Sequence, residues 1–152
     1  MLQEGDKAPE FQGKNQNGEL ITLSDFKGKR IILYFYPKDN TPGCTAEACN
    51  LNDNSAYFLD KGFVVIGVSA DSVESHLKFA SKYELMFNLI SDTDKTILQA
   101  YGAWGEKKNY GKTYMGVLRS TFVISAEGII EKVFAKVDTK THSEQIIKSL
   151  GL

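Results

Sequence analysis

One stretch of the sequence combines a buried strand, a tight turn and a helix start, and it restricts the folds open to the chain. Residues 31–36 form a continuous apolar run, which is typical of a strand buried on both faces. Residues 36–49 follow, read Y-P-K-D-N-T-P-G-C-T-A-E-A-C, and hold both cysteines and two of the three prolines. Thr41 is a good N-cap and Pro42 suits the first helical position. The stretch therefore predicts an α/β fold.

Cys44 falls in the first turn of this expected helix, where backbone N–H groups have no intrahelical partner. These groups and the helix dipole favour an anion, so the thiol should ionise readily, and the thiolate is the nucleophile. We expect the Thr41 hydroxyl to accept a hydrogen bond from a first-turn N–H, and Gly43 to let the backbone approach a small ligand. The alternative is a small buried side chain without chemistry, the common state of a free cysteine.

Cys49 lies five residues beyond Cys44. On an ideal helix this spacing separates the two Cα atoms by roughly 8.6 Å, whereas a disulfide needs less than about 7 Å. The cysteines therefore either never bond, or bond when the helix unwinds locally during a redox cycle. A thioredoxin-type C-x-x-C is absent. We expect no metal or other cofactor, because structural zinc needs four ligands and only His76 and His142 could join the cysteines.

Composition bounds the class of protein. The 152 residues are 42% hydrophobic, which predicts one domain over residues 1–152 with a proper core. The net charge of −1 argues against a nucleic-acid partner or attraction to an anionic membrane. The start of the chain is polar, and no apolar run approaches the ~20 residues of a membrane span. We expect a cytoplasmic protein, where a cysteine pair is more often catalytic or redox-sensing than structural.

The remaining elements follow from periodicity and turn residues. We expect hairpins, strands and helices in the following order: a hairpin of residues 11–14 and 19–23, a strand at 30–36, a helix at 41–59, a strand at 63–70, a helix at 72–83, a strand at 88–91, a helix at 92–101, a long loop at 103–117, a hairpin of 118–125 and 129–135, and a helix at 143–150. This order gives a mixed sheet with helices on both faces, which fits the thioredoxin-like fold.

Several side chains outside the cysteine segment are interpreted as structural. In the helix at 72–83 we place Val73, Leu77 and Ala80 on the buried face. We interpret His76 and His142 as solvated helix residues without a role. Trp104 is assigned to packing, and the lysines of the long loop are assigned to solvent: Lys107, Lys108 and Lys112.

The cysteine segment also carries a family resemblance. Pro37, Thr41 and Cys44 match P-x-x-x-T-x-x-C, the active-site signature of the peroxiredoxins. The longer run resembles the subfamily called bacterioferritin comigratory protein, or peroxiredoxin Q. Residues 5–11, 101–112 and 119–124 are also similar to that subfamily, so the resemblance covers nearly the whole chain.

The resemblance implies a thioredoxin-like fold, with a central mixed β-sheet flanked by helices and an N-terminal β-hairpin. It implies reduction of hydrogen peroxide and organic hydroperoxides, in the service of antioxidant defence and cell redox homeostasis. Cys44 matches the peroxidatic cysteine and Cys49 the resolving cysteine of many members. Sulfenic acid on Cys44 would condense with Cys49 to a disulfide, which thioredoxin or a similar dithiol protein would reduce. We expect a monomer.

Four further residues match the family's site. Thr41 and Arg119 match polar groups around the thiolate, and Pro37 matches the proline that shields it. Arg119 has several fixed donors for negative charge that moves across the O–O bond. Glu47 matches a glutamate that positions the arginine, and it lies one turn beyond Cys44. The simpler alternatives are a surface cation for Arg119 and a helix stabiliser for Glu47.

Two other functions were weighed against a peroxidase. The first is a thioredoxin-like thiol–disulfide carrier without peroxidase activity, and the second is a non-enzymatic binding or holdase protein. The missing C-x-x-C and the presence of Pro37, Thr41 and Arg119 favour the peroxidase over the carrier. The sequence contains no evident exposed apolar stripe that would favour a holdase.

Overall fold

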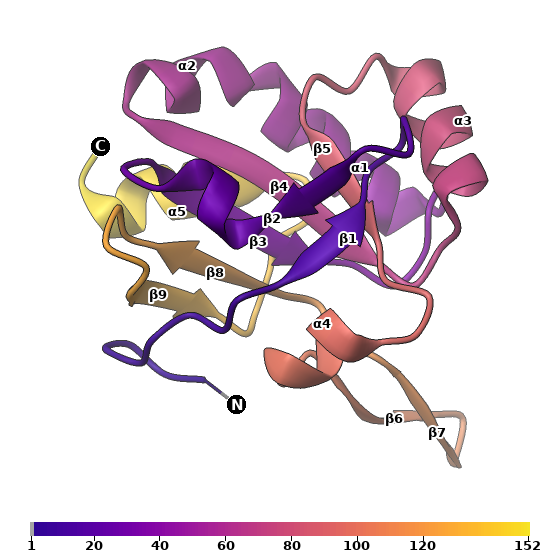
Figure 1. Cartoon of the computed structure of the whole chain (residues 1–152). Helices are drawn as coiled ribbons and strands as arrows, with labels where there is room; N and C mark the ends of the chain where they lie inside the picture. The colour runs from indigo at the N-terminus through magenta and orange to yellow at the C-terminus, as the bar shows by residue number, and fades with distance from the viewer. Residues whose placement is uncertain (1) are drawn as a thin grey trace.

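The computed structural model describes residues 2–152, and a seven-stranded mixed β-sheet forms its centre (Figure 1). The strands lie in the order β2-β1-β5-β4-β3-β8-β9. Their bounds are β1 Gln12–Lys14, β2 Leu20–Thr22, β3 Arg30–Phe35, β4 Phe63–Ser69, β5 Asn88–Ser91, β8 Ser120–Ile124 and β9 Ile130–Phe134. β3 pairs in parallel with β4 on one side and antiparallel with β8 on the other, so it is a central strand. The predicted N-terminal hairpin is formed by β1 and β2.

The helices cover both faces of the sheet, and β3 explains how. Alternate residues of β3 enter two different cores: Ile31, Leu33 and Phe35 on one face, Ile32 and Tyr34 on the other. One core contains side chains of α4 (Thr96–Ala100). The other core contains side chains of α1 (Pro42–Asp53), α2 (Ser55–Asp60), α3 (Val73–Tyr83) and α5 (His142–Leu150). The expected arrangement of helices on both faces is thus present.

The helix expected at residues 41–59 is divided in two at Asn54. Asn54 has φ −105° and ψ 5°, and its Nδ2 donates to the carbonyl of Asn50 at 2.9 Å. The Ser55 hydroxyl donates to the carbonyl of Asn52 at 2.9 Å. These side chains compete with the backbone for the same carbonyl groups. α1 therefore ends at Asp53, and both cysteines lie within this one helix.

The long loop expected at residues 103–117 is a β-hairpin instead. Its strands are β6 (Trp104–Asn109) and β7 (Lys112–Val117), and they extend away from the main sheet at the lower right of Figure 1. Tyr110 and Gly111 both have positive φ, 51° and 78°, as a type I′ hairpin turn requires. The polar sequence concealed the strands. Trp104 packs against the core as expected, but Lys107 donates to the carbonyl of Val117 at 3.0 Å and is not simply solvated.

The buried face of α3 differs from the expected one, and both histidine interpretations are wrong. Leu77 is 46% exposed, whereas His76 and Phe79 are buried together with Ala80. His142 is also fully buried. None of the helices within residues 2–152 combines the length and the apolar character that crossing a membrane requires.

Candidate active site

Cys44 lies in the first turn of α1, which begins after the loop of residues 36–41 that follows β3. Pro42 begins the helix and Thr41 is the N-cap, with extended backbone at φ −96° and ψ 156°. The Cys44 side chain is buried, and both cysteines are free. The predicted helix start is therefore present, and the helix terminus favours an anion at this thiol.

Thr41 makes a different hydrogen bond from the one expected. Its hydroxyl does not cap the helix but donates to the carbonyl of Lys38 at 2.8 Å. The preceding loop turns back far enough to bring that carbonyl within reach. Since the hydroxyl proton is used in this way, the Thr41 oxygen keeps its lone pairs for another donor. Pro37 stands in the same loop and is half-buried.

Arg119 connects the thiol to Glu47. One guanidinium nitrogen, Nη2, donates to Cys44 Sγ at 3.2 Å, and the other, Nη1, donates to Glu47 Oε1 at 2.5 Å. Arg119 stands just before β8 rather than inside a strand, and its side chain is only 23% exposed. Burial alone would lower the pKa of Arg119, but the charges of Cys44 and Glu47 outweigh it and raise the pKa. The guanidinium therefore stays charged beside the sulfur.

Glu47 is buried, and its carboxylate is only half satisfied. Oε1 accepts from Arg119, whereas Oε2 finds no hydrogen-bond partner among the described residues. Burial raises the pKa of Glu47 to about 7, although Arg119 opposes this shift. The Glu47 carboxylate thus bonds the same guanidinium that donates to Cys44 Sγ.

His142 lies beside this group, and the sequence interpretation missed it. Its Nε2 is 3.9 Å from Glu47 Oε2, 2.8 Å from Thr121 Oγ1, and its Nδ1 is 2.9 Å from Gln145 Oε1. An amide oxygen only accepts, so Nδ1 carries the proton and Nε2 accepts from Thr121. Burial lowers the pKa of His142, so the ring is neutral and adds no second cation to Glu47. The only available signal was the i, i+3 spacing of His142 and Gln145 on one helix.

Cys49 is partly buried on the same helix as Cys44. Burial, followed by the charge of Asp53, raises the pKa of the Cys49 thiol. Because α1 is continuous from Pro42 to Asp53, the helical separation of roughly 8.6 Å between the two Cα atoms applies. The site therefore brings Cys44, Glu47 and Arg119 into contact, but not Cys44 and Cys49.

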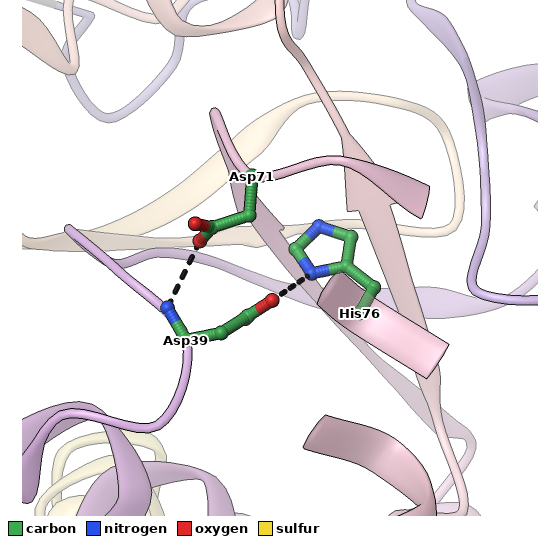
Figure 2. Close-up of side chains that lie close together, drawn as sticks. All are labelled: Asp39, Asp71 and His76. Carbon is green, nitrogen blue, oxygen red and sulfur yellow. Dashed lines mark hydrogen bonds and ion pairs between the residues drawn. The ribbon is translucent and has the colours of Figure 1, made fainter. Parts of the chain in front are cut away.

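A second cluster lies behind the same loop. Asp39, Asp71 and His76 are the members of one group, within the described chain, whose potential ligand atoms all lie within 4.8 Å of one another (Figure 2). Neither cysteine belongs to it. The cluster includes a histidine that the sequence interpretation had left without a role.

Comparison with known proteins identifies the family. The model of the AhpC/TSA family matches residues 4–133, which is most of the chain. The chain belongs to the AhpC/TSA family. The resemblance stated from the sequence is therefore confirmed.

Similar members of the AhpC/TSA family cover nearly the whole chain. Peroxiredoxin Bcp of Bacillus subtilis is 48% identical over 146 residues, covering 96% of this chain and 93% of the relative. A cysteine variant of PrxQ from Xylella fastidiosa superposes with a TM-score of 0.93 at 33% identity, over 99% of this chain and 96% of that one. The bacterioferritin comigratory protein of Xanthomonas campestris superposes with a TM-score of 0.87 at 36% identity, over 93% of this chain and 90% of that one. The predicted thioredoxin-like α/β fold with a mixed sheet is confirmed.

Proposed function

We propose that this member of the AhpC/TSA family is a thiol-dependent peroxidase that reduces hydrogen peroxide and organic hydroperoxides through Cys44. The observation that supports it most strongly is the Arg119 guanidinium, which bonds both Cys44 Sγ and the buried Glu47 carboxylate. A charged donor beside the sulfur favours the thiolate, which is the reactive form. The Xanthomonas campestris protein is described as having alkyl peroxide reduction activity, which supports the same substrate class here.

In the first step the Cys44 thiolate attacks one peroxide oxygen and the O–O bond breaks. The sulfur becomes a sulfenic acid, and the other oxygen leaves with its electron pair and takes a proton, giving water or an alcohol. Negative charge moves from sulfur to the leaving oxygen, and Arg119 is placed to stabilise it. The Thr41 oxygen, whose proton is engaged by Lys38, accepts a hydrogen bond from the peroxide O–H. Pro37 shields the thiolate from water.

In the second step Cys49 attacks the sulfenic sulfur, an S–S bond forms, and the hydroxyl leaves as water. Four residues separate the cysteines, so α1 must unwind between them. Unwinding also removes Cys49 from the burial that raises its pKa. A thioredoxin or similar dithiol protein then reduces the disulfide by exchange.

The setting of the enzyme belongs to the same proposal. We assign residues 1–152 to one domain, although residue 1 lies outside the described residues. We further propose a monomer located in the cytoplasm, without nucleic-acid or membrane partners. The alternative of a thiol–disulfide carrier is less well supported. Such a carrier does not need an arginine bonded to its cysteine, and this chain lacks a C-x-x-C pair around Cys44.

The test is hydroperoxide consumption by the reduced protein, with thioredoxin and its reductase present. We expect turnover with the wild type and none with Cys44→Ser, because a hydroxyl is hardly ionised at neutral pH. Cys49→Ser is the matched control: its first oxidation should keep the wild-type rate, while turnover falls and excess peroxide drives Cys44 to sulfinic acid. Turnover by Cys44→Ser, or none by the wild type, would contradict the proposal.

A further inference from the structure

The loop between β3 and α1 carries Pro37 and Thr41, and its middle residue is bound from several sides. The Asp39 carboxylate is buried and accepts hydrogen bonds from the Tyr36 hydroxyl through Oδ1 and from the Ser75 hydroxyl at 2.8 Å through Oδ2. Oδ2 also lies 2.7 Å from His76 Nδ1. The Asp39 backbone N–H donates to Asp71 Oδ2 at 2.9 Å. Figure 2 shows the Asp39 carboxylate pointing at the His76 ring and its backbone nitrogen facing Asp71.

The contacts of His76 require a shared proton between the ring and Asp39. His76 Nε2 is 3.0 Å from the carbonyl of Ile90, and a carbonyl only accepts, so Nε2 carries a proton. A bare lone pair on Nδ1 would then face the Asp39 oxygen at 2.7 Å, which is repulsive. A proton therefore lies between Nδ1 and Oδ2. This makes the contact a strong, buried bond between the loop and α3.

α3 also holds the next residue of the loop. Asn40 has a left-handed backbone with φ 60°, a conformation that few residues other than glycine adopt and that asparagine tolerates best. Its Oδ1 accepts from Tyr83 Oη at 3.3 Å and from Lys82 Nζ at 3.5 Å. Two consecutive loop residues are thus attached to one helix. The loop conformation depends on α3, although the hydrogen bond to Cys44 Sγ comes from Arg119 and not from α3.

The same cluster has the residue types of a cation site, but its hydrogen bonds assign it another role. Asp39 Oδ1 and Oδ2 both accept from donors, and Asp71 Oδ2 accepts from the Ser69 hydroxyl at 2.6 Å as well as from Asp39. His76 uses both ring nitrogens. Neither Asp39 nor His76 has a polar atom left without a partner. The cluster therefore acts by fixing backbone rather than by offering ligands.

We propose that His76 is a positioning residue for peroxide reduction, acting through Asp39 to hold the loop that presents Thr41 and Cys44 to Arg119. This inference rests on the proposed peroxidase function. Loss of the His76–Asp39 bond releases the loop and with it the first turn of α1, so attack on peroxide slows. Formation of the Cys44–Cys49 disulfide, which needs that turn to unwind, does not slow.

Two substitutions of His76 separate its two bonds. His76→Asn keeps a donor near the position of Nδ1, and so keeps the bond to Asp39, while His76→Gln keeps one near Nε2, and so keeps the bond to Ile90. Each variant loses one hydrogen bond. We expect His76→Gln to slow oxidation of Cys44 about tenfold, because small misplacements of reacting groups are costly, and His76→Asn to stay within about threefold of the wild type.

The measurement is single-turnover oxidation of reduced protein by hydrogen peroxide, quenched with a thiol-blocking reagent and followed by mass spectrometry. It reports loss of the Cys44 thiol and appearance of the disulfide separately. In His76→Gln we expect only the first rate to fall. Amide exchange of residues 38–44 in the reduced protein should also be faster in this variant. Equal rates in the two His76 variants, or a parallel fall of both steps, would overturn the proposal.

A pair of serines in α3 provides a second test that leaves His76 intact. Ser75→Ala removes a donor to Asp39, whereas Ser72→Ala removes only the N-cap bond of α3, in which Ser72 Oγ accepts from the Ser75 N–H at 3.1 Å. We expect a slower first step in Ser75→Ala and an unchanged one in Ser72→Ala, although both lose stability. If Ser72→Ala also slowed the first step, lower stability of α3 would explain the slower rates, and the inference would be refuted. Inactive wild type would instead refute the proposed function.

Discussion

At the scale of single residues, the chemistry depends on how one guanidinium divides its donors. Arg119 faces a sulfur with Nη2 and a carboxylate with Nη1, so the two acceptors share one fixed, planar cation. A lysine offers a point charge and cannot hold both positions in this geometry. We therefore expect Glu47 to act by orienting Arg119 rather than by contacting the peroxide.

Replacing Arg119 tests this division of donors. Arg119→Ala should slow the second-order reaction with hydrogen peroxide by on the order of 10²-fold or more, the usual cost of losing a donor aimed at developing charge. Arg119→Lys is the matched variant, because it keeps the positive charge but loses the two parallel N–H donors of the guanidinium. Its rate constant should lie between those of the wild type and Arg119→Ala. Stopped-flow or competition kinetics on the reduced protein measure the rate. An unchanged rate in Arg119→Ala would remove Arg119 from the mechanism.

The raised pKa of Glu47 predicts a pH dependence. Below about pH 7 Glu47 takes up a proton and its bond to Arg119 loses one charge, so the oxidation rate should fall as pH is lowered through about 7. The other groups facing Glu47 are Arg119, Cys44, the buried Tyr34 hydroxyl and His142, and burial lowers the pKa of His142. Glu47→Gln should lack this step in its pH–rate profile.

The raised pKa of Glu47 can also be tested through the pH dependence of protein stability. A carboxyl whose folded pKa is raised contributes stability below its unfolded value near 4.5, and that contribution is lost as pH rises through about 7. The free energy of unfolding of the wild type should therefore fall, relative to Glu47→Gln, between about pH 4.5 and 7. Denaturant titrations at several pH values measure this difference. A constant difference would show that the carboxylate is not desolvated as the structure implies.

At the scale of elements, the proposed mechanism requires α1 to be a helix for the first step and to come apart for the second. Its far half is held by α5: the Ser143 N–H donates to Asn50 Oδ1 at 2.7 Å, and the Ser143 hydroxyl donates to the Asn50 carbonyl at 3.1 Å. Asn50 directly follows Cys49. The contact with α5 therefore limits unwinding to the segment between the two cysteines, and the rest of the helix stays in place.

Hydrogen exchange can detect this limited unwinding. In the oxidised protein, amides of residues 45–49 should exchange faster than in the reduced protein, because those N–H groups lose their helical partners. Amides of α2 should change much less and serve as the internal control, because their partners lie outside the unwound segment; the Phe58 N–H, for example, donates to the carbonyl of Asn54 at 3.0 Å. Mass spectrometry on the same samples establishes that the disulfide is present. Equal protection of residues 45–49 in both forms would contradict the argument from helix spacing.

At the scale of the whole molecule, the active site rests on close packing beneath it. Tyr34 of β3 lies under the site and stacks on Tyr36, with ring centroids 5.4 Å apart. Gly67 of the neighbouring β4 makes room for its ring: a Cβ at Gly67 would lie 2.9 Å from Tyr34 carbons and 2.9 Å from Leu89 Cδ2. Glycine is therefore required at position 67 because any larger residue would collide with the Tyr34 ring of β3.

Substitution of Gly67 should cost stability through overpacking. We expect Gly67→Ala to lower the free energy of unfolding by about 1–3 kcal/mol, because the aromatic ring and Leu89 must both move. Gly43→Ala is the contrasting variant: its added Cβ would approach Arg119 no closer than 3.4 Å, and alanine favours a helix, so stability should hold. Urea unfolding followed by circular dichroism compares the two. Equal stabilities of the two variants would refute the packing argument.

Features that depend on neighbouring residues follow from the sequence alone. The apolar run of β3, the helix start at Pro42 and the place of Cys44 in the first turn follow from local propensities and all are present, whereas the side-chain cap expected of Thr41 is not. The spacing of Cys44 and Cys49 on one helix was equally local. The signature formed by Pro37, Thr41 and Cys44 is equally local and indicates the family.

Contacts between distant polar groups, in contrast, depend on the tertiary fold. His76 and His142 belong to amphipathic helices, and helix periodicity alone does not distinguish a buried histidine with partners from a solvated one. Their partners, Asp39 and Thr121, come from other parts of the chain. The β6–β7 hairpin escaped prediction because its strands lack the alternation of apolar residues that a half-buried strand shows. Contacts between remote segments depend on sheet order and packing, which local patterns do not encode.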